Sequence, residues 1–294
     1  MSKARVKTVL RAKDQLVQKF KQAQRSDQVL VLFGLVLVLS IIFLGVFASV
    51  ISPYSPTEMG DDRLSPPSTT HLMGTDYLGR DVFSRILYGT RVSLVVAVLA
   101  ISLSLAIGAG LGSLSGYFGG HVDRVIGVFM DALYSFPVII LALVMAFALG
   151  TGVEKTAIAV GIALVPSNYR LTRSLVLSVK ERGFIEGVKA IGAGNFYVIT
   201  RHILPNCLSS LAVLTSFNIA EGIISVAGLG FIGLGIQQPT PEWGGDLKIG
   251  RDVLAVGAWW VSVFPGLMIF LMVVGINSLA EGINAMFKIG VERR

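Results

Sequence analysis

Apolar residues gather along this chain in long stretches that polar connections separate. A helix needs roughly 20 apolar residues to cross about 30 Å of hydrocarbon, and most of these stretches reach that length. They cover residues 29–51, 92–114, 125–149, 156–169, 208–235 and 258–283. The fourth is short and contains Pro166, which a membrane helix tolerates where neighbouring helices satisfy the freed carbonyl. The pattern predicts an all-α, polytopic membrane protein with six transmembrane helices.

Composition supports a bilayer environment. Of the 294 residues, 53% are hydrophobic and only 15% are charged, a balance that the surface of a water-soluble domain of this size cannot accommodate. The net charge of +7 would suggest nucleic acid as the partner of a soluble protein. Here the cations lie in connections and tails, without the interleaved aromatic residues that contact bases. We therefore expect membrane lipid as a partner and no nucleic acid.

Lysine and arginine are distributed unevenly over the connections. If the N-terminus is cytoplasmic, the inner connections and tails carry 18 of these residues and the outer ones carry 7. Positively charged connections are retained on the cytoplasmic side of a membrane. The distribution therefore predicts that both termini and the connection 170–207 face the cytoplasm.

Six segments of the chain are expected to differ in role. The apolar run of the first helix is longer than a signal-peptide core, so we expect it to remain as an anchor. The leader before it has apolar residues at helical spacing, which fits either an amphipathic helix on the inner leaflet or a disordered basic tail. The segments are a basic cytoplasmic leader (1–28), the first helix (29–51), an external segment (52–91), a five-helix core (92–283) containing the cytoplasmic connection (170–207), and a cytoplasmic tail (284–294).

Small residues recur at every fourth position of the second apolar stretch. Such spacing forms a groove along one helix face, which lets a neighbouring helix backbone approach closely. The glycines of this series are Gly108, Gly112, Gly116 and Gly120. We assign the series to helix packing, with its last members entering a turn.

Two carboxylates fall inside apolar stretches. A carboxylate is costly in hydrocarbon, so a functional role competes with a satisfied polar contact at each position. Asp131 is within two turns of the cytoplasmic edge, which favours a polar contact or a position among lipid headgroups. Glu221 is deeper in the fifth stretch, and both a pathway-lining role and a hydrogen-bonded structural role are open.

Catalytic motifs are absent or occur in the wrong context. Residues 228–233 match the dinucleotide fingerprint G-x-G-x-x-G, but they lie in a membrane stretch and not in a βαβ unit. The chain has no Walker A run, no H-E-x-x-H pair and one cysteine, Cys207, which excludes multi-cysteine metal sites. We therefore expect a non-catalytic protein that binds neither metal nor cofactor.

A basic connection between the fourth and fifth stretches has the spacing of a short amphipathic helix. Phe184, Val188 and Ile191 fall at i, i+4 and i+7, which places them on one helix face. Gly192 can end that helix and Pro205 can begin the next one. Periodicity alone leaves two options open: a helix lying on lipid, or a helix inserted into a groove of another protein.

This connection resembles the coupling loop of ABC-importer permeases. The pattern of that loop is E-A-A, three residues, G, nine residues, I-x-L-P, and Glu186, Gly192 and Pro205 occupy its E, G and P positions. The departures from the pattern are Gly187, Val188 and His202.

Two further blocks resemble the dipeptide/oligopeptide/nickel branch of these permeases, in its C-type subunit. They are residues 71–94 (HLMGTDYLGRDVFSRILYGTRVSL) and residues 230–244 (GFIGLGIQQPTPEWG) with 264–266 (FPG). The similarity covers nearly the whole chain beyond the leader. Val226 stands where relatives often carry a glutamate, which increases the interest of Glu221 one helical turn away.

The resemblance implies a type I ABC importer permease fold in a prokaryotic inner membrane. It also implies a homologous second permease subunit, two ATPase subunits that use ATP and Mg²⁺, and an extracytoplasmic substrate-binding protein. The coupling helix is expected to enter a cleft on one ATPase, with an apolar plug, a charge-assisted contact and glycines that permit close approach. The residues assigned to these tasks are Phe184, Glu186, Gly187, Val188, Gly192 and Pro205.

Substrate and external contacts are less constrained by the sequence. The resemblance implies import of di- or oligopeptides, with nickel chelates, glutathione and oligosaccharides as alternatives. A stand-alone channel or secondary transporter is the competing class, although the inverted repeats of many secondary transporters are not evident. External residues could dock the binding protein or could support the fold. They are Asp76, Arg80, Asp81, Gln237 and Trp243.

Overall fold

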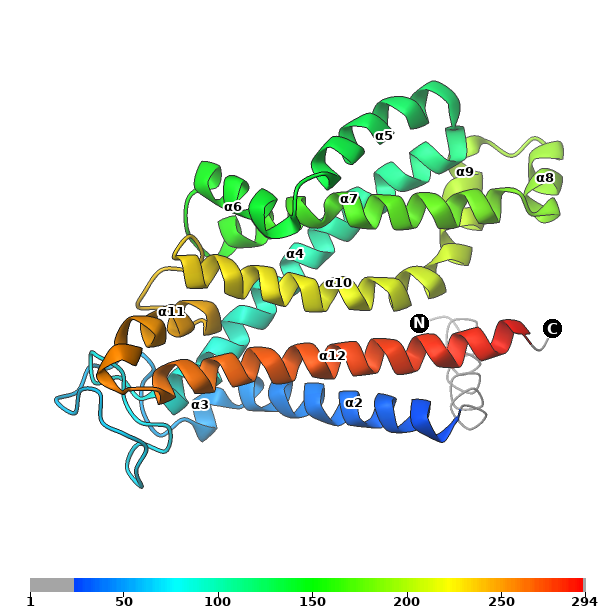
Figure 1. Cartoon of the computed structure of the whole chain (residues 1–294). Helices are drawn as coiled ribbons and strands as arrows, with labels where there is room; N and C mark the ends of the chain where they lie inside the picture. The colour runs from blue at the N-terminus through cyan, green and yellow to red at the C-terminus, as the bar shows by residue number, and fades with distance from the viewer. Residues whose placement is uncertain (1–23, 293–294) are drawn as a thin grey trace.

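Helices make up the regular structure of the computed structural model, which describes residues 24–292 (Figure 1). Within that range the β-pairing is limited to one isolated antiparallel bridge between Thr75 and Asp81. The α-helices are α2 (Arg25–Val46), α3 (Ala48–Ile51), α4 (Val82–Phe118), α5 (Gly120–Tyr134), α6 (Val138–Leu149), α7 (Val153–Lys180), α8 (Gly183–Ala190), α9 (Asn195–Val198), α10 (Leu204–Ile232), α11 (Trp243–Val253) and α12 (Trp260–Glu292). A π-helical turn (Ile199–Ile203) joins α9 to α10, and a 3₁₀ turn (Leu254–Val256) follows α11. Most of the predicted leader lies outside the described residues.

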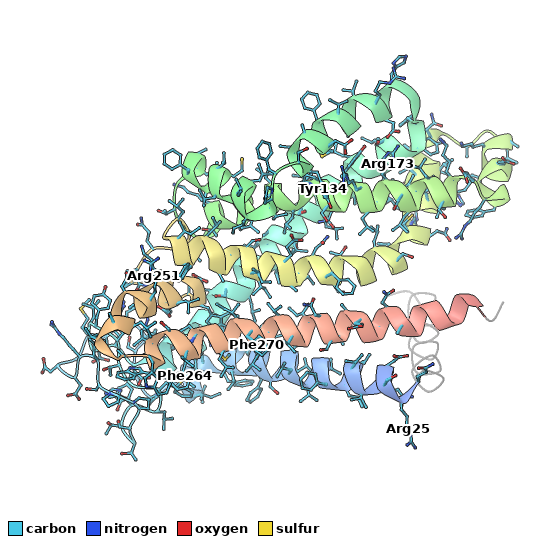
Figure 2. All side chains as sticks on the ribbon, viewed as in Figure 1. Arg25, Tyr134, Arg173, Arg251, Phe264 and Phe270 are labelled. Carbon is cyan, nitrogen blue, oxygen red and sulfur yellow. The ribbon has the colours of Figure 1, made fainter. Side chains whose placement is uncertain are left out.

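Four of the described helices are long and apolar enough to cross a membrane. They are α2, α4 and the segments Thr215–Ile232 of α10 and Trp260–Ala285 of α12. A fifth crossing is available if α5 and α6, which meet at a bend of 93°, form one broken span. Large apolar side chains such as Phe270 of α12 are exposed on the outer surface (Figure 2), where lipid would solvate them.

The third apolar stretch was expected to be one helix, and the structure divides it. α5 ends at Tyr134 and α6 begins at Val138, with Pro137 as its N-cap residue. Proline has no backbone N–H and restricts the residue before it, so Phe136–Pro137 interrupts the helical hydrogen bonds. The expectation of a single helix over 125–149 was wrong, because hydropathy stays high across the break.

The fourth stretch is longer than predicted. α7 begins at Val153 and continues past the apolar run to Lys180, and Pro166 lies inside it, in contrast to the predicted limits of 156–169. Much of α7 is buried against α4, α6 and α10. A helix enclosed by other helices meets little lipid, so it needs less apolar surface than a peripheral span.

The glycine series of α4 packs against α7, as its spacing predicted. A Cβ atom on Gly108 would lie 2.7 Å from the Cβ of Asn168, and one on Gly112 would lie 2.7 Å from the Tyr169 carbonyl oxygen. A Cβ on Gly116 would lie 3.0 Å from Val176. Gly120 differs, because it begins α5 with φ +53° and has no contact within 4 Å. The series thus serves packing up to Gly116 and turn formation at its end.

Buried amides join three central helices. The Asn168 side-chain amide of α7 donates to the Ser104 hydroxyl of α4 at 2.7 Å. The Asn218 side-chain amide of α10 donates to the Asn168 side-chain oxygen at 2.8 Å. These amides are buried, where a lost hydrogen bond has no replacement from water. The chain of bonds fixes the rotation of α10 relative to α7.

The two ends of the helix bundle differ in content. α8 lies at the same end as the start of α2 and the end of α12 (Figure 1). α11 and the loop 52–81 lie at the opposite end (Figure 1). The connection predicted to be cytoplasmic and the segments predicted to be external are therefore separated by the length of the bundle.

Candidate functional site

The helix predicted in the connection exists as α8, and Ile185 is its one fully buried side chain. Ile185 is fully buried, although the sequence pattern gave it no role. It belongs to an apolar cluster of the connection and the ends of α4, α7 and α10. The other buried members are Tyr117, Val176, Val179, Val198, Ile199, Ile203, Cys207 and Leu211. Burial of this side chain holds α8 against the membrane helices.

The outward surface of the connection differs from the predicted apolar face. Phe184 and Ile191 are exposed as expected, but Val188 is half-buried and packs against the Ile185 cluster. Phe196 and Tyr197, at 79% and 54% exposure, extend the exposed apolar surface. Sequence reasoning missed both aromatic residues, although two adjacent rings in a connection between apolar stretches were a visible signal. Val188 thus contributes less to an exposed plug than predicted.

The other residues assigned to the coupling role, in α8 and after it, are exposed. Glu186 is exposed, and its carboxylate makes no hydrogen bond or ion pair with any residue that the structure describes. No atom of the described residues lies within 4 Å of a Cβ built on Gly187 or Gly192, so neither glycine permits a close approach to this part of the chain. Gly192 has φ +84°, a left-handed conformation that favours glycine after a helix. Pro205 is exposed in the first turn of α10.

Polar contacts brace the same end of the bundle. The Tyr117 hydroxyl donates to the Asn195 side-chain oxygen at 2.7 Å, and Lys189 lies 4.8 Å from the centre of the Tyr117 ring. The Arg173 guanidinium pairs with Asp123 at 2.6 Å. The first two contacts join the connection to α4, and the third joins α7 to α5.

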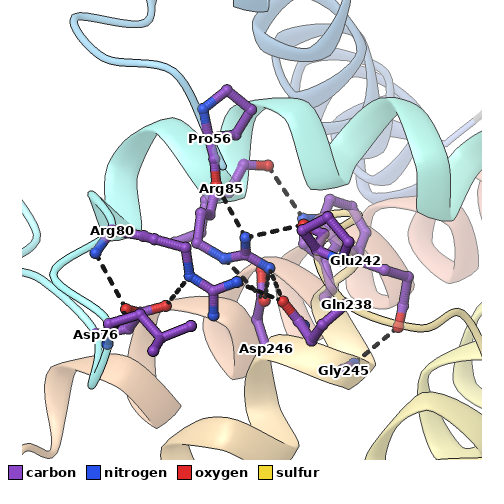
Figure 3. A network of polar contacts seen from close by, with 12 residues as sticks. Pro56, Asp76, Arg80, Arg85, Gln238, Glu242, Gly245 and Asp246 are labelled. Carbon is purple, nitrogen blue, oxygen red and sulfur yellow. Dashed lines mark hydrogen bonds and ion pairs between the residues drawn. The ribbon is translucent and has the colours of Figure 1, made fainter. Parts of the chain in front are cut away.

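At the opposite end, a buried charge network joins the loop 52–81 to α4 and α11 (Figure 3). Arg80 pairs with Asp76 at 2.6 Å, and Arg85 pairs with Asp246 at 2.5 Å. Gln238 accepts from both guanidinium groups, at 2.7 Å from Arg80 and 3.0 Å from Arg85. All four charged side chains are almost completely buried. Buried ions persist only when they are paired in this way.

Most of the predicted docking residues belong to the interior. Asp76, Arg80, Asp81 and Trp243 have exposures of 2% or less. The Asp81 carboxylate caps α4 by accepting from the Ser84 N–H at 2.7 Å. With so little surface, these four side chains favour the fold-supporting alternative over contact with a binding protein. Gln237 is the one residue of the predicted set that is exposed.

The start of α11 depends on a buried glutamate that sequence reasoning missed. Glu242 accepts from the Gly244 and Gly245 N–H groups, both at 2.8 Å, which is the geometry of an N-cap. The Ser93 hydroxyl of α4 donates to the same carboxylate at 3.2 Å. Burial raises the pKa of Glu242 to about 7, although these hydrogen bonds oppose the rise. The network therefore contains a carboxyl group that titrates near neutral pH.

The two intramembrane carboxylates have different surroundings. Asp131 pairs with Arg170 at 2.6 Å, and both side chains are exposed. The Arg170 guanidinium also lies 3.7 Å from the centre of the Tyr134 ring, which is labelled between α5 and α7 in Figure 2. Asp131 therefore has the polar contact that its position favoured. Glu221 lines a cavity of about 300 Å³ between α5, α6, α7 and α10.

Comparison with known proteins identifies the family. The profile described as "Binding-protein-dependent transport system inner membrane component" matches residues 108–292. A dipeptide transport system permease protein of Alkalihalophilus pseudofirmus is 39% identical over 268 residues, covering 91% of this chain and 87% of the relative. A glutathione transport system permease protein of Pectobacterium atrosepticum is 40% identical over 249 residues, covering 84% and 82%.

A third relative and a solved structure agree with this family assignment. A di/tripeptide transport system permease protein of Pseudomonas aeruginosa is 38% identical over 258 residues, covering 85% of each chain. A chain of the inward-facing MetNI methionine ABC transporter superimposes with a TM-score of 0.53 at 16% identity, covering 68% of this chain and 96% of the other. That likeness supports the fold, that of an ABC importer permease. The sequence matches show more: this chain belongs to the family of inner membrane components of binding-protein-dependent transport systems.

Proposed function

We propose that this chain is a permease subunit of an ATP-driven importer and forms half of the translocation pathway for di- and oligopeptides. The relatives named above are permeases of dipeptide, glutathione and di/tripeptide transport systems. Peptides are the substrate class common to these names. Identity of 38–40% over more than four-fifths of the chain supports the same class here.

In this proposal the chain crosses the inner membrane six times, with both termini in the cytoplasm. The bent pair α5–α6 forms the third crossing and α7 forms the fourth, in addition to the four long apolar helices. Six crossings return the chain to its starting side, which agrees with the start of α2 and the end of α12 lying at one end of the bundle (Figure 1). The excess of lysine and arginine in the connections at that end supports a cytoplasmic location.

The cytoplasmic connection is proposed to receive the force of ATP hydrolysis. The observation that carries this proposal is the arrangement of α8, whose Ile185 is buried in the permease while Phe184, Glu186 and Ile191 face outward. A helix that is fixed on one side and exposed on the other can act as a rigid lever. Phe196 and Tyr197 enlarge the surface available to the ATPase.

The complete transporter would contain four kinds of component. A second permease of related sequence completes the pathway, and two ATPase subunits bind and hydrolyse ATP with Mg²⁺ below it. A substrate-binding protein delivers the substrate from outside. This chain supplies no bond-making chemistry in the proposal, and its contribution is a pathway and a mechanical connection.

Charge reversal at the coupling helix tests the mechanical role. The complex is reconstituted in proteoliposomes, and ATP hydrolysis is measured with and without the loaded binding protein. Glu186→Lys is expected to leave the complex assembled and to abolish the stimulation of hydrolysis. Glu181→Lys is the matched control, because Glu181 is also an exposed carboxylate of this connection but precedes α8. Full stimulation in the Glu186→Lys complex would refute the proposed contact.

Uptake assays test the substrate class and whether this chain can transport without its partner subunits. Proteoliposomes with the complete transporter are expected to accumulate labelled dipeptide when ATP is enclosed, and nickel chelates and oligosaccharides serve as the alternative substrates. Proteoliposomes with this chain alone are expected to accumulate nothing under an ion gradient. Gradient-driven uptake by the chain alone would favour a secondary transporter instead.

A further inference from the structure

The cavity beside Glu221 lies between the break that separates α5 from α6 and the proline inside α7. α5 and α6 separate at residues 135–137, and their axes differ by 93°. Pro166 of α7 lies on the cavity wall near this break, and Glu221 of α10 completes the wall. The volume of about 300 Å³ is at the lower limit of small-molecule sites. It can therefore hold one end of a peptide but not a whole oligopeptide.

Glu221 occupies the open face of α10. Phe217, Glu221 and Ile224 follow one another at helical spacing and are exposed, whereas Ile223 and Val226 on the other side are buried among the other helices. No residue in the described part of the chain hydrogen-bonds or ion-pairs with the Glu221 carboxylate. A carboxylate that faced hydrocarbon without a partner would be costly. This face of α10 is therefore suited to a water-filled pathway.

The other charges near the cavity offset each other. Arg170 is paired with Asp131 at 2.6 Å, and its guanidinium lies against the Tyr134 ring. The C-terminal end of α5 and the N-terminal end of α6 meet at the break, so their opposite partial charges also offset. Among the residues that the structure describes, the cavity lining holds no lysine, arginine or histidine. Glu221 is left as the uncompensated charge of the cavity.

The remaining lining suits an organic cation. The exposed Phe136 supplies an aromatic ring, and Tyr134 supplies a second ring, one face of which Arg170 covers. Ser135 and Ser167 supply hydroxyl oxygens. A carboxylate beside aromatic faces attracts an ammonium group through both ion pairing and the ring quadrupole. A metal chelate with net negative charge would be repelled by the same carboxylate.

We propose that this cavity binds the α-ammonium group of the transported peptide, with the Glu221 carboxylate as its ionic partner. The inference rests on the proposed function, because it places a peptide in the pathway. It predicts that the permease itself favours substrates with a free, charged amino terminus, separately from any selection by the binding protein.

Transport provides the first test. Uptake of dialanine into proteoliposomes with the complete transporter is measured below saturation. Glu221→Gln, which keeps the shape and removes the charge, is expected to reduce uptake about tenfold, as for loss of a charge-assisted contact. Glu221→Asp is expected to retain most of it. Glu281→Gln is the matched control, since Glu281 is an exposed carboxylate of α12 that does not line the cavity.

A labelling experiment tests the cavity without relying on the binding protein. Ser167→Cys places a thiol on the cavity wall, and the native Cys207 is buried, so the new thiol is the reactive one of the two. In the full complex, a cationic thiosulfonate reagent is expected to react several times faster than an anionic one. Adding Glu221→Gln is expected to bring the two rates together. Dialanine is expected to slow the labelling, and N-acetyl-dialanine is expected to have little effect.

The outcomes separate this inference from the proposed function. Normal dialanine uptake in Glu221→Gln, or a ratio of labelling rates that does not change with Glu221, would overturn the ammonium site while peptide import stands. A wild-type complex that takes up no peptide would overturn the proposed function. In that case the ratio of labelling rates still decides whether the cavity prefers cations.

Discussion

The contact between α4 and α7 allows a sharp test of how this fold is held together. Gly112→Ala adds one methyl group at the centre of the glycine series. The new Cβ would lie 2.7 Å from the Tyr169 carbonyl oxygen, 2.9 Å from the Thr172 Cβ and 3.0 Å from the Arg173 nitrogen. The first distance is about 0.7 Å short of the 3.4 Å at which ordinary contact begins. These atoms belong to the backbone or lie next to it, so no flexible side chain can move aside.

The change in stability on Gly112→Ala is the sum of two opposing effects. Replacing glycine by alanine in a helix favours the helix by about 1 kcal/mol, and overpacking a tight interface costs about 1–3 kcal/mol. Gly110→Ala isolates the first effect, because a Cβ on Gly110 has no neighbour within 4 Å. The difference between the two variants therefore measures the packing term. α4 cannot pivot to relieve it, since Gly108 and Gly116 also lie close to α7 one turn away on either side.

Thermal unfolding in detergent measures this difference. The midpoint is the temperature at which half of the protein remains monodisperse. A packing term of about 1–3 kcal/mol corresponds to roughly 2–10 °C in a chain of this size. Gly112→Ala is expected to unfold at the lower temperature and Gly110→Ala at or above the wild-type value. Equal midpoints for the two variants would show that α4 and α7 do not approach as closely as described.

Three further predictions concern buried groups. The raised pKa of Glu242, about 7 against an ordinary value of 4.5, means that the folded protein holds an extra proton between these pH values, so stability falls as pH rises from about 4.5 to 7. The loss of stability over this pH range is about 3 kcal/mol. Glu242→Gln is expected to abolish it when unfolding midpoints are measured across pH, and an unchanged pH dependence would contradict the raised pKa of Glu242. Ile185→Ala is expected to cost about 2–5 kcal/mol and to speed tryptic cleavage around α8, whereas Ile191→Ala, at an exposed site, should leave the cleavage rate near wild type. Asn168→Leu is expected to cost about 1–3 kcal/mol in thermal unfolding because it leaves the Asn218 amide without its acceptor; a neutral effect would mean that another group satisfies that amide.

Several features of the fold followed from local pattern. Apolar length located the four long apolar helices, because the thickness of a bilayer sets a minimum length for any crossing segment. The four-residue spacing of small residues predicted a close helix contact, and Gly108, Gly112 and Gly116 make that contact with α7. Gly192 was expected to end a helix, and its φ of +84° agrees with that expectation.

Other features needed contacts that no local pattern contains. An amphipathic segment has two candidate inner faces, and the choice of Ile185 over Val188 as the buried anchor of α8 depends on the cluster that receives it. Arg80 was a candidate for external docking, but it is buried beside Gln238, 158 positions further along the chain. Arg85 likewise pairs with Asp246, 161 positions away. Local hydropathy contains no information about such distant pairs.

The sequence by itself determined the environment, the approximate helices and the family resemblance of this protein, because apolar length, glycine spacing and contiguous motifs are properties of neighbouring residues. The tertiary structure decided which buried or intramembrane charges have a partner and which one has none among the described residues. It buries Asp76, Arg80 and Asp246 in one network and pairs Asp131 with Arg170. It leaves Glu221 facing a cavity at the break between α5 and α6, beside Pro166 of α7. The cost of an unpaired charge depends on what surrounds it, and only the folded arrangement of helices sets those surroundings.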